Sequence, residues 1–491
     1  MAKEYGLRQK LGLISGIIVF IIILLIPVKI PTVEARRVLA ITALMAIWWS
    51  TEALPIPAVS LLPIGLFPIL GVMETGKVTV QYANHLIFLF MGGFLIAIAI
   101  QKWDLHKRIA LYIIRYVGTE PKRIILGFML ATAFLSMWIS NTATCMMMIT
   151  VATALLTHII ELGKEKNISG VIFEKGKFNF SIALILGVAF AANIGGIGTL
   201  IGTPPNALLA AFVEENLSYS ISFMQWMTIG IPIAVLLVPI TWLYLVNIGS
   251  PVKLDKIPGG NELVNERVKE LGPMNKGEKI VLIVFGITGF LWVSRSFIIT
   301  PFFPYVTDST IAIIMAISLF MIPVNLEERE FALDWEWGVQ IPWEVLILLG
   351  GGFALAEGIE TTGLGEWVAG LLGYLSNYSF IILLIGVVCL MLFLSQIASN
   401  TATTSMMLPI LLPLAKTVGA EPLNLMVPAT IAVSCVFMMP IGTPPNAIAY
   451  GTGYVTIPQM VKNGFGLELI IIPIIILLAY LLMFPLLGIY F

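Results

Sequence analysis

Long apolar stretches follow one another along almost the whole chain, and only short polar segments separate them. Each stretch is long enough for a membrane-spanning helix, or for a pair of shorter helices that enters and leaves the membrane on one side. Their approximate cores are residues 11–28, 37–54, 57–73, 84–101, 123–160, 179–215, 222–247, 279–299, 308–323, 343–360, 379–416, 425–455 and 466–490. The polar segments 161–178, 250–278 and 326–337 are too short for a separate soluble domain. This pattern predicts an all-α polytopic membrane protein.

The composition agrees with that prediction and excludes other classes. Of 491 residues, 58% are apolar and 11% are charged, whereas an ordinary soluble domain is about 25% charged. The formal net charge of −1 provides no basic surface for nucleic acid, so no nucleic-acid partner is expected. Cys145, Cys389 and Cys435 all lie in apolar runs, which excludes a secreted disulfide scaffold. The lipid bilayer is therefore the expected surroundings of the chain.

The basic residues predict the orientation of the chain in the membrane. Basic residues precede the apolar stretch 11–28, and no small-residue cleavage site follows it, so we expect a retained first helix. With the N-terminus in the cytoplasm, the basic segments 102–123 and 250–278 are cytoplasmic, and segment 361–378, which has no Lys or Arg, lies outside. This arrangement follows the positive-inside rule and predicts a multi-pass protein of the inner (plasma) membrane.

Two sequence motifs occur twice, which indicates an internal duplication. The sequence SNTAT occupies residues 140–144 and again 399–403, an offset of 259. The sequence IGTPPNA occupies 201–207 and again 441–447, an offset of 240. Five crossings separate the equivalent helices at 84–101 and 343–360, and an odd number makes the repeats inverted. Inverted repeats with interrupted helices are typical of secondary transporters.

Each SNTAT motif lies in the middle of an apolar stretch that is too long for one span. We therefore expect two re-entrant hairpins, 123–160 and 379–416, each with a polar tip. Asn141 and Asn400 would then begin the second helix of each hairpin, where free backbone N–H groups and the helix dipole favour an anion such as a carboxylate. The alternative is a polar contact between helices, which two equivalent copies make less favourable.

Each GTPPN motif predicts a broken helix, in 179–215 and in 425–455. Two consecutive prolines remove two backbone donors, and lipid offers no partner to the freed carbonyl groups. The unwound carbonyls suit a small cation, and the start of the following helix suits an anion. The alternative is a plain proline kink.

The expected motif elements contain no titratable side chain. Residues 124–157, 179–213, 379–415 and 422–460 have no Asp, Glu, Lys, Arg or His. Neutral oxygens can bind Na⁺ without a protonation step, so this favours sodium over protons as the coupling ion. No nucleophile–base pair or metal-ligand cluster stands out, so we do not expect an enzyme. Near the span ends, Glu52 and Arg295 are candidates for a structural ion pair.

The two SNT motifs, each followed by a proline-containing loop, and the segment 48–55 (WWSTEALP) resemble the divalent anion/sodium symporter family. That family includes bacterial and archaeal dicarboxylate carriers of the INDY type, and the resemblance covers essentially the whole chain. It implies a homodimer of subunits, each with scaffold and transport domains, and an elevator movement of the transport domain. The implied division is N-terminal scaffold helices in 1–83, a first transport part in 84–215, scaffold helices with a cytoplasmic loop in 216–342, a second transport part in 343–455 and a C-terminal scaffold helix in 456–491.

The resemblance also implies the residues of the binding site. The first sodium site would use Ser136, Ser140, Asn141 and the backbone at Gly202. The second would use Ser395, Ala398, Asn400 and the backbone at Gly442. The implied substrate contacts are Asn141, Thr142, Asn400 and Thr401, with Thr203, Pro204, Thr443 and Pro444 lining the pocket.

Two equivalent half-sites suit a molecule with two carboxylates. We therefore expect sodium-coupled transport of C4-type dicarboxylates such as succinate, malate or fumarate, by alternating access. Na⁺ would be a coupling ion and not a prosthetic group. The open alternatives are a cation-independent dicarboxylate exchanger of the same fold, or a symporter of sulfate or another divalent anion.

Overall fold

The structure is a computed structural model that describes residues 5–26, 30–165, 172–254, 260–371 and 377–486. Parts of the expected polar segments 161–178, 250–278 and 361–378 lie outside these residues. Among the described residues, eight helices are long and apolar enough to cross a membrane, which agrees with a multi-pass membrane protein. They are Leu7–Leu25, His85–Lys102, Asn141–Lys164, Asn179–Gly196, Phe223–Gly249, Lys276–Ile299, Phe380–Ile397 and Ile457–Leu486.

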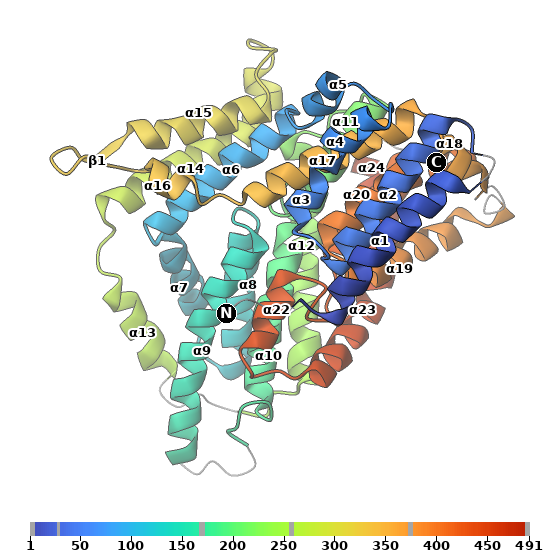
Figure 1. The fold of residues 1–491 in the computed structure, drawn as a ribbon. Helices are drawn as coiled ribbons and strands as arrows, with labels where there is room; N and C mark the ends of the chain where they lie inside the picture. The colour runs from blue at the N-terminus through green and yellow to red at the C-terminus, as the bar shows by residue number, and fades with distance from the viewer. Residues whose placement is uncertain (1–4, 27–29, 166–171, 255–259, 372–376, 487–491) are drawn as a thin grey trace.

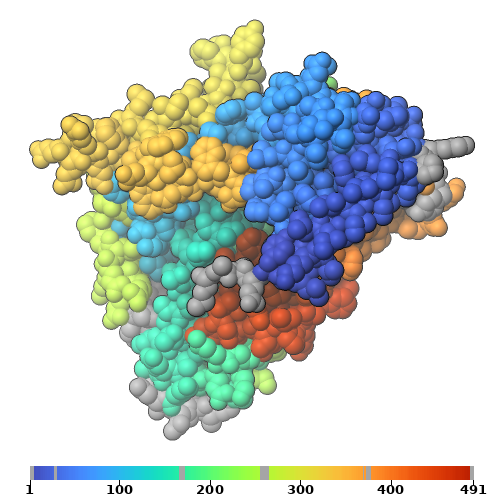
Figure 2. Space-filling model, viewed as in Figure 1, coloured from blue at the N-terminus to red at the C-terminus, as the bar shows by residue number. Residues whose placement is uncertain are grey.

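The N-terminal helices form one continuous block on the viewed face of the molecule, coloured blue in Figure 2. They are α1 (Leu7–Leu25), α2 (Val33–Thr51), α3 (Ile56–Ser60), α4 (Leu62–Ile69) and α5 (Thr75–Gln81). The next helices, α6 (His85–Lys102) and α7 (Leu105–Val117), leave this block and pack in the larger core. Helices α2 and α3 share a buried cluster with α17 (Trp343–Thr361) that includes Trp49, Phe67 and Leu355. This cluster is distinct from the larger core around the repeated motifs.

The expected hairpins and broken helices are present (Figure 1). The hairpins are α8 (Pro121–Ser136) with α9 (Asn141–Glu165), and α19 (Phe380–Ile397) with α20 (Asn400–Thr417). The broken helices are α10 (Asn179–Gly196) with α11 (Pro204–Leu217), and α21 (Pro422–Val433) with α22 (Pro444–Gly451). We call residues 136–141 and 395–400 the first and second tips, and residues 196–203 and 434–443 the first and second breaks. The predicted fold class is therefore confirmed.

The middle of the chain connects the two repeats. It contains α12 (Phe223–Tyr244), η1 (Leu245–Gly249), α13 (Gly260–Glu270), α14 (Lys276–Ser294), η2 (Arg295–Ile299), α15 (Asp308–Met321), α16 (Trp335–Gly338) and, after α17, α18 (Leu364–Leu371). A short hairpin, β1 (Pro323–Asn325) with β2 (Glu330–Phe331), was not expected from the all-α pattern. Lys102 Nζ fixes it to α6 by donating to Phe331 O (2.8 Å) and Asp334 Oδ2 (2.7 Å). The chain ends in α23 (Ile457–Leu478), η4 (Ala479–Met483) and α24 (Phe484–Leu486).

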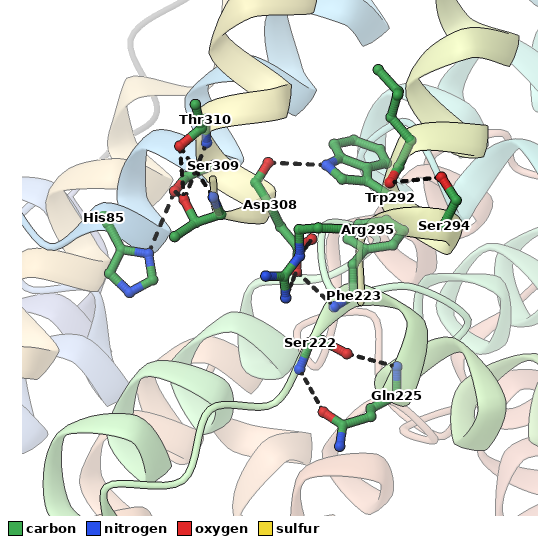
Figure 3. Close-up of polar contacts among 12 residues, drawn as sticks. His85, Ser222, Phe223, Gln225, Trp292, Ser294, Arg295, Asp308, Ser309 and Thr310 are labelled. Carbon is green, nitrogen blue, oxygen red and sulfur yellow. Dashed lines mark hydrogen bonds and ion pairs between the residues drawn. The ribbon is translucent and has the colours of Figure 1, made fainter. Parts of the chain in front are cut away.

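Asp308 joins the ends of three helices in this middle region (Figure 3). Its carboxylate pairs with Arg295 (2.5 Å between Nε and Oδ1) and accepts a hydrogen bond from Phe223 N (2.9 Å) at the start of α12. Trp292 Nε1 of α14 donates to Asp308 O (3.0 Å). The expected pairing of Arg295 with Glu52 is therefore wrong, because the sequence does not fix which span ends meet.

The second halves of the two broken helices pack reciprocally. Helix α11 of the first repeat lies against α20 and α21 of the second, and α22 of the second repeat lies against α9 and α10 of the first. Asn193 Nδ2 of α10 donates to Thr443 Oγ1 at 3.0 Å, and Cys145 Sγ of α9 lies 3.6 Å from Pro445 O. The two repeats are thus interlocked at their breaks.

Equivalent asparagines hold the two breaks. Asn206 Nδ2 donates to Gly196 O (2.9 Å) and Thr199 O (2.7 Å) of the first break. Asn446 Nδ2 donates in the same way to Val436 O and Met439 O (both 3.1 Å). Each pair of carbonyls is related to the other by the offset of 240. The asparagine of GTPPN therefore donates to two carbonyl groups at the interruption of the helix.

Replacement of Asn206 or Asn446 by Ala is expected to lower the thermal stability of the purified protein in detergent. Each change removes two hydrogen bonds and leaves one carbonyl, that of Gly196 or Val436, without its donor, at a cost of about 1–3 kcal/mol per buried group. Thr199 O and Met439 O still accept from Gly202 N (3.3 Å) and Gly442 N (3.2 Å). The melting midpoints of both variants should fall clearly below that of the parent chain. Asn216→Ala is the matched control, because Asn216 Nδ2 bonds only the backbone of its own helix (Phe212 O, 2.8 Å). Equal midpoints for N206A and N216A would contradict the assigned role.

Candidate functional site

The first tip meets the first break through Asn141, the first residue of α9. One terminal atom of its amide lies 2.7 Å from Ser136 Oγ, 3.1 Å from Ala192 O and 3.2 Å from Gly202 O. Ser136 Oγ also donates to Ala192 O at 2.7 Å. The hairpin and the broken helix therefore share one compact polar cluster.

The Asn141 amide can serve this cluster in two orientations. With its nitrogen toward the cluster, the amide donates to both carbonyls, and the polar groups satisfy one another. With its oxygen toward the cluster, two side-chain oxygens and two carbonyl oxygens converge. Unwound carbonyls and neutral side-chain oxygens are groups that coordinate Na⁺ in transporters with broken helices. The first tip thus has a donor set that fits sodium.

The second tip contains the equivalent oxygens in an unsatisfied state. Ser395 Oγ and Asn400 Oδ1, which correspond to Ser136 and Asn141, are buried and have no hydrogen-bond partner within the described residues. Ala398 ends α19 with an extended backbone, so its carbonyl lies outside the helical hydrogen-bond ladder. Buried oxygens without partners are costly, and a cation bound among them would satisfy them. These residues therefore also fit a sodium ion.

Glycines allow the tips and breaks to approach each other. A Cβ atom at Gly196 would lie 2.5 Å from Asn141 Oδ1, and one at Gly202 would lie 2.4 Å from Gly196 O. At Gly442 it would lie 2.6 Å from Val436 Cγ1 and 3.2 Å from the carbonyl oxygen of Ser395. A Cβ atom at Gly196 or Gly202 would therefore clash, and one at Gly442 would require Val436 to move, so glycine at these positions permits the close approach.

The serines of the tips cap the helices that follow. Ser140 Oγ accepts a hydrogen bond from Ala143 N (3.3 Å), and Ser399 Oγ accepts one from Ala402 N (3.2 Å). Ser140 was expected among the first sodium ligands, and the structure places its hydroxyl at this cap rather than in the cluster around Ser136. The remaining N–H groups of each first turn are left at the helix start, where they favour an anion.

The other expected substrate-contacting residues lie at four helix starts: Thr142, Thr401, Thr203, Pro204, Thr443 and Pro444. At the GTPPN starts, two successive prolines supply no N–H group. The threonine hydroxyl is the polar group that remains there, and Thr443 Oγ1 already accepts from Asn446 N (3.3 Å) and Asn193 Nδ2 (3.0 Å). The SNTAT starts, which keep their backbone N–H groups, are therefore better anion sites than the GTPPN starts.

Sequence reasoning missed three contributors to this region. The Ala192 carbonyl carries no sequence signal, because every residue has a carbonyl group. Asn193 and Glu468 do carry one, since each is a polar side chain with mostly apolar neighbours in its helix. Glu468 Oε1 of α23 accepts hydrogen bonds from Gln396 Nε2 (2.6 Å) and Phe437 N (2.8 Å). The motif elements themselves lack titratable groups as expected, but a carboxylate reaches the second break from outside them.

The charged and metal-binding side chains do not form a metal centre at the tips. Within the described ranges, no group of three or more His, Cys, Asp or Glu side chains could hold a metal ion. A cation at the tips would therefore rely on hydroxyl, amide and carbonyl oxygens.

Comparisons with known proteins agree with this arrangement. A family model described as the sodium:sulfate symporter transmembrane region matches residues 7–489. Proteins named sodium-dependent dicarboxylate transporter SdcS, from Staphylococcus saprophyticus and from Staphylococcus aureus strain USA300, are 44% identical over 494 and 492 residues. Each alignment covers 99% of this chain and 94% of the relative.

Two solved transporters share the fold at low sequence identity. The Neisseria gonorrhoeae MtrF structure matches with a TM-score of 0.57 and 12% identity, covering 98% of this chain and 96% of that one. The Alcanivorax borkumensis YdaH structure matches with a TM-score of 0.52 and 13% identity, covering 89% and 97%. The family match, the full-length relatives and the hairpin-and-break fold agree: this chain belongs to the sodium:sulfate symporter family, the divalent anion/sodium symporters that its motifs resemble.

Proposed function

We propose that this protein is a secondary active transporter that couples the movement of a C4-type dicarboxylate to sodium. The observation that carries the proposal is the pair of equivalent polar tips, each of which places an asparagine at a helix start and approaches a glycine-containing break, through Asn141 in the first and through the Ser395 carbonyl in the second. The names of the SdcS relatives, which specify sodium dependence and dicarboxylate, support the same function.

Sodium has a physical role at both tips. In the first, a cation would turn the Asn141 oxygen toward Ser136 and the two carbonyls; in the second, it would satisfy Ser395 Oγ and Asn400 Oδ1. Cation binding would thereby fix each tip against its break. The adjacent helix starts would then be ordered to accept the substrate, which couples the two ligands thermodynamically.

The substrate has two anionic ends because the site has two anion-binding helix starts. The first turns of α9 and α20, which contain Thr142 and Thr401, would each receive one carboxylate. Succinate, malate and fumarate have this form. The reaction is translocation without a covalent step, so we assign no catalytic residue and no prosthetic group.

We propose that the hairpins and broken helices move together against a scaffold, in a homodimer in the plasma membrane with a cytoplasmic N-terminus. The separate hydrophobic cluster of the N-terminal block supports a scaffold there. Trp226 Nε1 of α12 donates to Ile197 O in the first break (2.8 Å), and Glu468 of α23 bonds the second break. These contacts favour assigning α12 and α23 to the moving part, unlike the division expected at residues 216 and 456.

Uptake of radiolabelled succinate into proteoliposomes of the purified chain tests the function. We expect uptake to require an inward Na⁺ gradient and to stop when choline replaces Na⁺, because cation binding is what orders the tips in this proposal. Excess malate or fumarate should compete more strongly than sulfate. Uptake that ignores Na⁺ but requires internal dicarboxylate would instead identify an exchanger, and strong competition by sulfate alone would contradict the substrate class.

Asn141→Ala and Asn400→Ala are each expected to reduce succinate uptake to background. Each change removes an amide oxygen that is expected to bind sodium while leaving the hydrophobic core intact, so the protein should stay folded and keep its oligomeric state. Thr150→Ala on α9 and Thr417→Ala on α20 are matched controls, because these hydroxyls bond their own helix backbone (both 2.9 Å) away from the tips. Wild-type uptake in both asparagine variants would contradict the site.

A further inference from the structure

Glu468 is a carboxylate in the middle of the apolar helix α23, and it is only 5% exposed. An ionisable group at such a position is costly unless a partner compensates its charge. The ion pairs found among the described residues do not include Glu468. Its hydrogen-bond partners are a neutral side chain and a backbone N–H group, so a bound cation is a partner that would offset its charge in the ionised form.

The hydrogen bonds around Glu468 fit the ionised form. Gln396 Oε1 accepts from Met439 N (3.2 Å), which turns Gln396 Nε2 toward the carboxylate. The Phe437 N–H group is also a donor. Glu468 Oε1 therefore receives two hydrogen bonds, and an ionised carboxylate, which can only accept, is the form that these donors stabilise.

The same hydrogen bonds place this charge beside the second tip. Gln396 directly follows Ser395, whose hydroxyl is unsatisfied, and Phe437 and Met439 belong to the break that contains Gly442. The carboxylate thus joins α23, the end of α19 and the second break in one buried network. The side chain that donates to Glu468 is thus the sequence neighbour of Ser395, one of the expected ligands of the second sodium ion.

The first half-site lacks this charge. The position equivalent to Gln396 is Met137, and its carbonyl accepts from Thr199 Oγ1 (2.5 Å). In the first break, the N–H groups of Ile197 and Gly198 bond carbonyls of the preceding turn (3.1 and 2.9 Å) and need no external acceptor. The buried negative charge therefore distinguishes the second half-site from its pseudo-symmetric copy.

We propose that Glu468 is a positioning residue that raises the sodium affinity of the second tip. Its charge attracts the cation across the Gln396 amide, and its hydrogen bonds hold the break and the tip in the arrangement that the cation needs. Cation binding in turn neutralises the buried charge. This inference rests on the proposed sodium coupling, and it makes the two cation sites unequal in affinity.

The test compares Glu468→Gln with the parent chain in two measurements on purified protein. The first is the rise of the melting midpoint with Na⁺, at constant ionic strength with choline. The second is succinate uptake at varied Na⁺. In E468Q, we expect the Na⁺ concentration for half-maximal effect to rise about tenfold, equivalent to about 1.4 kcal/mol of lost attraction, while the KM for succinate at saturating Na⁺ stays within about twofold.

The charge-swapped variant Gln396→Glu/Glu468→Gln distinguishes the effect of the buried charge on sodium affinity from the effect of side-chain packing. It returns the carboxylate to the same pair, so we expect it to recover most of the sodium affinity. Glu344→Gln, which removes an exposed carboxylate at the start of α17, is the neutral control. An unchanged sodium response in E468Q, or a charge swap that restores none of the sodium affinity, would overturn the inference. A parent chain that ignores Na⁺ would instead refute the sodium coupling itself.

Discussion

The constraint on which this structure depends is that backbone polar groups inside a membrane must find partners within the protein. Two helices are broken in their middle, and each break frees carbonyl groups that lipid cannot satisfy. Asn206 and Asn446 donate hydrogen bonds to some of these carbonyl groups, in the same way in both repeats. The carbonyls that face the tips remain available, so the feature that is costly for folding is also the one that can bind a cation.

Because of the duplication, the arrangement of a tip against a helix break occurs twice, which gives a site with two ends. Because α11 packs on the second hairpin and α22 on the first, neither repeat can form its half-site alone. The result is a pair of helix starts and a pair of breaks around a common centre, which matches a ligand with two like charges. The copies have nevertheless diverged. The N–H groups of Ile197 and Gly198 in the first break bond their own preceding turn, whereas N–H groups of the second break bond Gln396 and Glu468 from outside their own helix.

Much of this organisation could be predicted because it is encoded by local chemistry. Proline pairs break helices wherever they occur, and a polar motif inside a long apolar stretch requires a turn, so the hairpins and breaks follow from residues 140–144, 201–207 and their copies. Contacts between distant elements could not be predicted in this way. The pairing of Arg295 with Asp308, the approach of the Ala192 carbonyl to Asn141 and the reach of Glu468 into the second break all depend on how helices pack.

The most direct test of the account is a structure of the purified protein in lipid nanodiscs with Na⁺ and succinate, determined by cryo-electron microscopy. We predict one ion among Ser136, Asn141 and the carbonyls of the first break, a second beside Ser395 and Asn400, and succinate between the starts of α9 and α20. The Asn141 amide oxygen should face the first ion. Succinate bound away from both tips, or tips without ions at saturating Na⁺, would contradict the claim that the breaks and tips form the transport site.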